Sequence, residues 1–251
     1  MSGHSHWASI RRKKEIVDSK KGKVFSKYAK QITSAARQGG ADPDSNAKLT
    51  FAIEQARAVN MPKDNIERAI KKGGGAAGEQ GQISEVAYEA YGPGGVAIIV
   101  EAITDNRNRT SADIRNMIES SGGTLGASGC VSWMFEKRGL FIVEKGQIEE
   151  DKLTQIALDG GAEDLELVGD TYQITCQPQD FATVRKALLD QKVTVASSQI
   201  ANIPKSTCPV SESVGRRVIA LLEKLEEHED VQAVHSNVEL SEQLLTEAPT
   251  G

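Results

Sequence analysis

The sequence predicts an α+β protein in which an N-terminal three-helix domain precedes two α/β domains, the last inserted into the middle one. Three observations support this prediction. Apolar residues recur at helical spacing as far as a glycine-rich stretch at 73–81, and the period then changes to that of strands. From residue 139, strands and helices follow in the order βαββαβ. With 251 residues, the chain is long enough for two or three compact units.

The first domain is expected over residues 1–75, as a basic arm and a helical bundle. Phe25, Tyr28 and Ile32 share one face of a helix predicted over 23–38, and Lys and Arg side chains line the opposite face. Gly39 and Gly40 end this helix, and residues 42–45 supply a turn and a cap for a second one. A third, short helix ends in glycines 73–75, where the linker to the next domain begins.

The middle domain is expected to be discontinuous, over 82–134 and 203–240. Strands at 86–91 and 96–102 form a hairpin about a Gly-Pro-Gly-Gly turn, and a helix follows over 110–120. Far along the chain, a last helix at 214–228 and a last strand at 231–238 have no neighbours of their own. Since one strand and one helix cannot stand alone, we expect them to fold back onto the hairpin.

The inserted third domain is expected over 135–202. Its predicted strands and helices alternate regularly, at 140–144 (strand), 148–159 (helix), 164–168 and 171–176 (strands), 181–190 (helix) and 193–200 (strand). This order is that of the split βαβ, or ferredoxin-like, arrangement.

Charge is segregated along the chain. Residues 1–72 hold 16 Lys and Arg against 7 Asp and Glu, whereas the remainder holds 14 against 28. Clustered cations on an otherwise acidic protein favour a polyanionic partner, and a solvated helix face is the alternative interpretation. Lys and Arg side chains match phosphates, so the sequence predicts nucleic-acid contacts. The candidate residues are Arg11, Arg12, Lys13, Lys14, Lys20, Lys21, Lys23, Lys27, Lys30 and Arg37.

A possible second phosphate site lies at 104–110, between an apolar strand and a helix start. Arg107 and Arg109, together with backbone N–H groups there, could hold a phosphate. The alternative is structural. Asp105, Asn106 and Thr110 are favourable turn and cap residues, and the two arginines could pair with local carboxylates.

The sequence gives no positive sign of catalysis, so we expect no enzyme, no catalytic residues and no cofactor. The four histidines have no evident nucleophile partner. A metal site is not expected, because His4 and His6 have no third ligand nearby. Three widely spaced cysteines fit a reducing compartment. With no apolar run long enough for a bilayer and no leader, we expect a cytoplasmic protein without membrane contact. The low aromatic content argues against an aromatic stacking platform.

Several segments, in this order along the whole chain, resemble the YebC/PmpR family, which includes the mitochondrial translational activator of cytochrome oxidase. They are the opening GHSHWA with its basic arm, NMPKDNIERAIKKG at 60–73, YGPGGVA at 91–97, residues 104–110, and VSWMF at 131–135. The resemblance implies three domains, with the third inserted into the second. Bacterial members of that family are described as probable DNA-binding transcriptional regulators, and others associate with ribosomes and ease elongation.

We therefore expect a nucleic-acid-binding regulatory protein, a probable DNA-binding transcriptional regulator. The alternative is a ribosome-associated translation factor that contacts ribosomal RNA. Both need a surface for polyanions, so the basic arm does not choose between them. In either case the acidic α/β domains could meet a protein partner.

Overall fold

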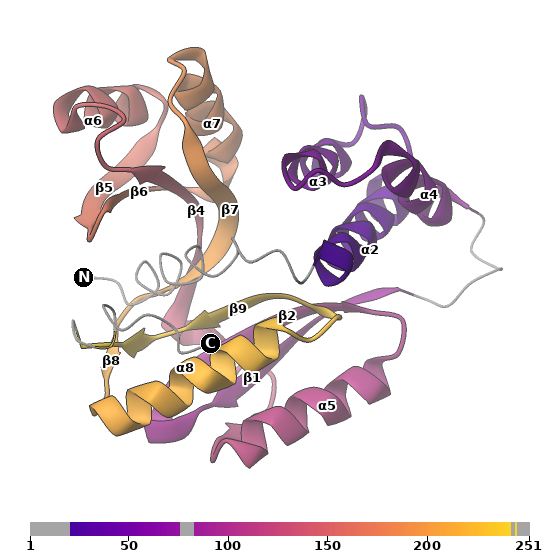
Figure 1. Ribbon diagram of the computed structural model, residues 1–251, viewed down its shortest axis with the longest axis vertical. Coiled ribbons are helices and arrows are strands. Elements are labelled where there is room, and N and C mark those ends of the chain that lie inside the picture. Colours follow the sequence, from indigo (N-terminus) through magenta and orange to yellow (C-terminus); the bar gives the residue numbers. More distant parts are fainter. Residues whose placement is uncertain (1–20, 76–82, 242–243, 245–251) are drawn as a thin grey trace.

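The computed structural model of the protein describes residues 21–75, 83–241 and 244, and it has the α+β fold class that the sequence predicts (Figure 1). A helical unit is followed by a middle sheet of order β3-β1-β2-β9 and a third-unit sheet of order β5-β6-β4-β7. No helix of the described ranges is long and apolar enough to cross a bilayer.

The helical unit consists of α2 (Lys21–Gly39), α3 (Ala47–Ala58) and α4 (Lys63–Gly74). Ile32, Leu49 and Ile66 are buried between them. Residues 43–45 form the expected turn, but the cap predicted at 42–45 is wrong, because Asn46 caps α3. The buried Asn46 side chain accepts from Leu49 N at 3.0 Å and donates to Ala35 O at 2.9 Å and Gly40 O at 2.8 Å. One amide thus fastens the end of α2 to the start of α3.

The middle sheet brings together segments that are far apart in the sequence. Strands β1 (Ser84–Tyr91) and β2 (Ala97–Thr104) form the antiparallel hairpin, β9 (Val231–Ser236) pairs with β2, and the short β3 (Thr124–Leu125) pairs with β1. Helices α5 (Arg107–Ser120) and α8 (Glu212–Glu226) cover one face of this sheet (Figure 1). Two further short strands, β8 (Cys208–Pro209) and β10 (Val238–Glu239), pair in parallel. The exact limits of this discontinuous domain stay a prediction.

The third unit has six main elements: β4 (Phe135–Glu144), α6 (Glu150–Asp159), β5 (Ala162–Val168), β6 (Thr171–Cys176), α7 (Phe181–Asp190) and β7 (Val195–Pro204). All neighbouring strands are antiparallel, as in a split βαβ arrangement. Strand β4 begins before the predicted residue 140, and β7 continues past 200. Their extra pairs run from Phe135↔Pro204 to Arg138↔Ala201. The charged side chains there do not show the apolar pattern of a strand, although their backbone pairs as one.

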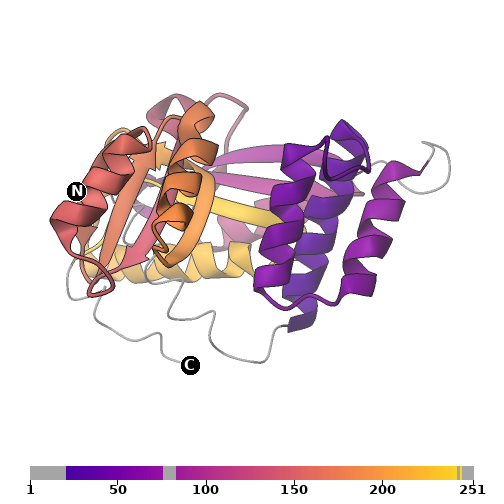
Figure 2. The same cartoon turned by 90° about the horizontal axis from the view of Figure 1, so that it is seen from above.

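The helical unit and the third unit lie beside each other, on the side of the middle sheet away from α5 and α8 (Figures 1 and 2). The Phe51 ring of α3 meets the Phe181 ring of α7 edge-on, with centroids 5.6 Å apart. Arg185 lies over Phe51 at 5.3 Å and pairs with Glu54 at 2.7 Å. The basic helical unit therefore contacts the third unit through α3 and α7, and it contacts the middle unit through α2 and β2.

Candidate nucleic-acid interface

The predicted basic arm lies largely outside the described residues. The arm residues that are not described are Arg11, Arg12, Lys13, Lys14 and Lys20, and their role stays a prediction. Lys21 begins α2, and Lys23 is exposed near the same end. Arg37 is half-buried in the last turn of the helix.

The cationic stripe along α2 consists of Lys23, Lys27, Lys30 and Arg37. Its two central lysines are held by the middle unit. Lys27 Nζ donates to the backbone oxygen of Glu226, at the end of α8. Lys30 Nζ donates to the Asp230 carboxylate and, at 3.3 Å, to the backbone oxygen of Glu229. Thus the stripe that the sequence predicts as one phosphate-binding line is divided, and its centre is part of a contact between units.

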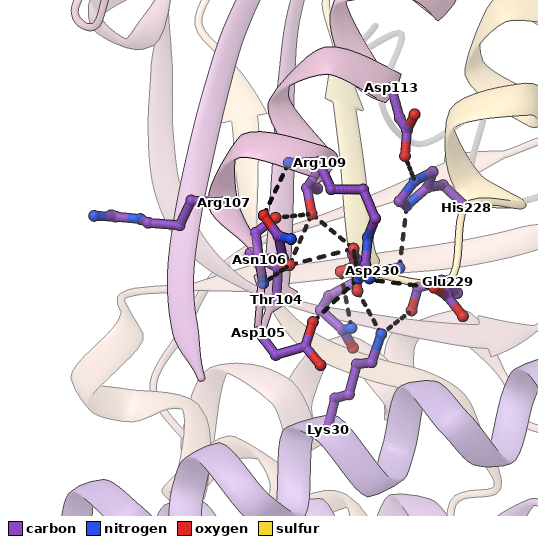
Figure 3. Close-up of polar contacts among 12 residues, drawn as sticks. Lys30, Thr104, Asp105, Asn106, Arg107, Arg109, Asp113, His228, Glu229 and Asp230 are labelled. Atoms are coloured by element: carbon purple, nitrogen blue, oxygen red, sulfur yellow. Dashed lines mark hydrogen bonds and ion pairs between the residues drawn. The ribbon is translucent and has the colours of Figure 1, made fainter. Parts of the chain in front are cut away.

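Lys30 belongs to a group of polar side chains that we call the Asp230 cluster: Lys30, Thr104, Arg109, Thr110 and Asp230. All of them except Thr110 are labelled in Figure 3. The Asp230 side chain is fully buried, at 0% exposure. Its Oδ2 accepts hydrogen bonds from Thr110 Oγ1 at 2.7 Å and Thr104 Oγ1 at 3.3 Å, and Arg109 lies 3.3 Å away. Burying an unpaired carboxylate costs free energy, so the hydrogen bonds and cations of the cluster compensate for the burial of Asp230.

The local fold explains why these side chains meet. Thr104 ends β2, Thr110 lies in the first turns of α5, and Asp230 directly precedes β9, which pairs with β2. Ile103 N donates to Asp230 O at 2.8 Å, which continues the pairing beyond the strand. Burial alone would raise the pKa of the Asp230 carboxyl. The hydrogen bonds from Lys30, Thr110 and Arg109, together with the positive charge of Lys30, outweigh burial, so this pKa lies below its ordinary value.

The possible second phosphate site is helical rather than a loop. Helix α5 begins at Arg107, before the predicted residue 110, because the Asn106 side chain caps it by accepting from Arg109 N at 3.1 Å. Arg109 pairs with three carboxylates, those of Asp105 at 3.1 Å, Asp230 at 3.3 Å and Glu229 at 3.9 Å. Arg107 is exposed and points away from the cluster (Figure 3). Arg109 is therefore already occupied by acidic groups, as the structural alternative supposed.

The exposed side of α4 carries cations that sequence reasoning did not select as phosphate ligands. They are Lys63, Arg68, Lys71 and Lys72. Asp64 and Glu67 share this side, and Glu67 pairs with Lys63 at 3.4 Å. Within the described part of the chain, Lys71 and Lys72 have no ion-pair partner. The spacing of Arg68, Lys71 and Lys72, at i, i+3 and i+4, was the signal that could have found this face.

Two family models match the chain. One is the N-terminal domain of the TACO1/YebC protein, over residues 5–76, and the other is the TACO1/YebC second and third domain, over residues 83–238. The chain belongs to the TACO1/YebC family. This confirms the family resemblance of the quoted segments.

Relatives within the TACO1/YebC family match the chain over almost its full length. A probable transcriptional regulatory protein of Desulfotalea psychrophila is 50% identical over 247 residues, 98% of each chain. One of Rubrobacter xylanophilus is 44% identical over 247 residues, 98% of this chain and 99% of the relative. The crystal structure of a conserved hypothetical protein from Aquifex aeolicus matches with a TM-score of 0.89 and 44% identity, over 96% of this chain and all of that one.

In this TACO1/YebC chain, the charge segregation persists in the described part. Residues 21–75 hold 11 Lys and Arg against 5 Asp and Glu, whereas residues 83–241 hold 14 against 25. No group of three or more His, Cys, Asp or Glu side chains within these ranges is placed to hold a metal ion.

Proposed function

We propose that this TACO1/YebC protein is a regulatory, non-enzymatic protein of the cytoplasm that binds nucleic acid, specifically a DNA-binding regulator of transcription. The observation that supports it most is the excess of cations in the helical unit beside acidic α/β units. The net charge of the first attracts a phosphate backbone and that of the second repels it, so the helical end would supply most of the phosphate contacts. The names of the two relatives, probable transcriptional regulatory proteins, support regulation of transcription.

The surface that we propose for phosphates consists of the arm, Lys23 and the exposed side of α4. Lys71 and Lys72 are the best-placed described members, because both are exposed without an acidic partner among the described residues. A phosphate contact by Lys27 or Lys30 would require these lysines to leave Glu226 and Asp230. Contacts of this kind give affinity and register rather than base identity, so sequence preference would come from elsewhere.

The test is a double charge reversal on α4 in the full chain, Lys71→Glu with Lys72→Glu. The matched control is Lys145→Glu with Lys152→Glu, which changes the net charge equally at two exposed positions of the third unit. Affinity for a labelled DNA duplex, measured by fluorescence anisotropy at low salt, should fall about tenfold or more for the α4 variant. The control should stay close to wild type. An equal loss of affinity in both variants would mean that only the net charge of the protein matters, and the proposed surface would be wrong.

The alternative target, ribosomal RNA, enters as a second arm of this test. A basic surface binds RNA and DNA alike, since phosphates are common to both. Sedimentation of the same variants with purified ribosomes at moderate salt separates the two targets. Binding to ribosomes that depends on Lys71 and Lys72, together with weak duplex binding, would replace transcription by translation as the regulated process.

A further inference from the structure

Two exposed aromatic side chains of the middle unit converge on one backbone oxygen. Trp133 is 67% exposed and Tyr91 is 39% exposed. The Tyr91 hydroxyl donates to Cys130 O at 2.9 Å, and Trp133 Nε1 donates to the same oxygen at 3.0 Å. Tyr91 ends β1, and Trp133 lies in a short 3₁₀ turn, η3 (Ser132–Met134), directly before β4. Both rings are thus oriented by hydrogen bonds while they face solvent.

The loop that carries Trp133 is firmly built. The carboxylate of Glu89 accepts backbone N–H groups from Gly129 at 2.7 Å and from Val131 and Ser132, both at 2.8 Å. Burial by itself would raise the pKa of Glu89, but these three hydrogen bonds outweigh it and lower that pKa. On either side of Trp133, Val131 and Phe135 are buried against β2. The exposure of Trp133 is therefore a property of an ordered loop.

Solvent-facing aromatic rings of this kind contribute little to folding. A single exposed apolar side chain is common and needs no explanation. Two rings held at one oxygen are a different case, because their apolar faces stay in water although nearby apolar residues are buried. This arrangement indicates a surface for a ligand.

A cation lies beside the pair. Lys205 Nζ donates to Trp133 O at 3.0 Å, and the Lys205 side chain is exposed. An ammonium group has three donors, so two remain for a ligand. Aromatic faces with a neighbouring cation are the combination that binds single-stranded nucleic acid, in which bases stack on the rings and phosphates meet the charge. The low aromatic content of the chain does not exclude such a site, since two rings suffice once the fold brings them together.

We propose that Tyr91 and Trp133 stack an unpaired base of a nucleic acid, with Lys205 at the adjoining phosphate. This inference rests on the proposed function and narrows it to a nucleic acid with unpaired nucleotides. In a duplex each base is stacked and paired, so its face cannot reach the rings. Strand β1 spans eight residues between Ser84, near the helical unit, and Tyr91. That length is about 25 Å, so a ligand that reaches from the helical unit to the two rings must span about this distance.

The closing experiment uses Trp133 as its own probe. The chain has two tryptophans, so Trp7→Phe leaves Trp133 as the only one. The full-length variant is titrated with a labelled single-stranded oligonucleotide and with the duplex of the same sequence, while anisotropy reports binding and emission reports stacking. We expect the single strand to quench Trp133 in step with binding. We expect the duplex to bind without quenching.

Substitutions then test the contribution of each ring. Trp133→Ala should weaken single-strand binding about 5- to 100-fold and leave duplex binding within about twofold. Tyr91→Phe keeps the ring and loses only its hydrogen bond, so its effect should be smaller than that of Tyr91→Ala. Leu158→Ala, at a 55% exposed position of α6, is the control for loss of an exposed apolar side chain and should bind as wild type.

Three outcomes would overturn the inference, and they differ in what they leave standing. Normal binding without quenching, and without an effect of Trp133→Ala, would remove the stacking site and leave the proposed function intact. An absence of binding to any nucleic acid at low salt would remove both. Quenching by a proline-rich peptide but by no oligonucleotide would assign the two rings to a protein partner.

Discussion

Helices α2 and α4 both carry lysines at helical spacing, yet they use them differently. The central lysines of α2 reach the middle unit, where Lys30 meets the buried carboxylate of Asp230. The lysines at the end of α4 are exposed, and among the described residues they meet no carboxylate. A row of positive charge in a sequence therefore has two possible partners, the protein's own acidic groups and an external polyanion. Only the fold decides between them.

The energetic weight of the two sets also differs. An exposed ion pair contributes about 0 to 1 kcal/mol, because water and salt already screen the charges. A buried carboxylate that loses its partners costs about 3 to 5 kcal/mol, since the charge is left desolvated. The α2 contact should therefore matter for stability and the α4 face for binding.

The largest expected effect follows from Asp230→Ala. Without this carboxylate, Thr104 and Thr110 lose a buried acceptor and Lys30 loses its anchor on the middle unit. We expect the free energy of unfolding, measured by urea denaturation, to fall by about 2 to 3 kcal/mol, because the buried hydroxyls of Thr104 and Thr110 lose this acceptor. Asp105→Ala, which removes only an exposed pair with Arg109, should cost less than about 1 kcal/mol. Equal losses would show that the Asp230 cluster is no more than a surface pair.

A pH series sharpens this prediction. Because the pKa of Asp230 is lowered in the folded protein, its contribution is complete above the ordinary aspartate value of about 3.9. It is lost as the pH falls below that value and through the folded pKa. The difference in unfolding free energy between wild type and Asp230→Asn should be constant from pH 7 to about pH 5 and then shrink. A difference that does not change with pH down to 3 would contradict this assignment.

A smaller effect is expected at the other polar contact of the helical unit. Glu85 of β1 accepts from Ser34 Oγ at 2.7 Å and pairs with Lys48 at 2.8 Å, but Lys48 and Glu85 are both exposed. Glu85→Gln should therefore lower the free energy of unfolding by less than about 1 kcal/mol. A loss as large as that of Asp230→Ala would mean that this edge, and not the Asp230 cluster, fastens the helical unit.

The smallest effect on stability is expected from neutralising α4. Lys71→Gln with Lys72→Gln removes no described ion pair, so the free energy of unfolding, measured by urea denaturation, should stay within about 0.5 kcal/mol of wild type. A clear loss of stability would reveal a structural role for these lysines and weaken their assignment to a ligand.

The fold was predictable where periodicity is strong. Strand β6 and helix α7 have the predicted limits, because their apolar patterns and flanking turns are unambiguous. The start of β4 was missed, since Glu136, Lys137 and Arg138 look like loop residues and only pairing with β7 makes them a strand. Likewise, Asn46 was overlooked as a cap because the preceding acidic residues and proline gave a strong turn signal of their own.

The sequence predicted where the positive charges gather, but it did not predict which of them are free to bind a ligand. No feature near Lys30 in the sequence indicates Asp230, 200 residues away, as its partner. In the same way, Tyr91 and Trp133 share the Cys130 oxygen only after β1 and the loop before β4 have folded together. Long-range partners of this kind depend on tertiary packing, and local patterns do not encode them.

Which lysines bind phosphate is tested by the salt dependence of nucleic-acid affinity for two neutralised pairs. These are Lys71→Gln with Lys72→Gln on α4, and Lys27→Gln with Lys30→Gln on α2. We expect the α4 pair to make the negative slope of log affinity against log salt shallower by about 1 to 2, and the α2 pair to change it less, since Lys27 and Lys30 already have partners in the fold. A larger change for the α2 pair, or an unchanged slope for the α4 pair, would contradict this expectation.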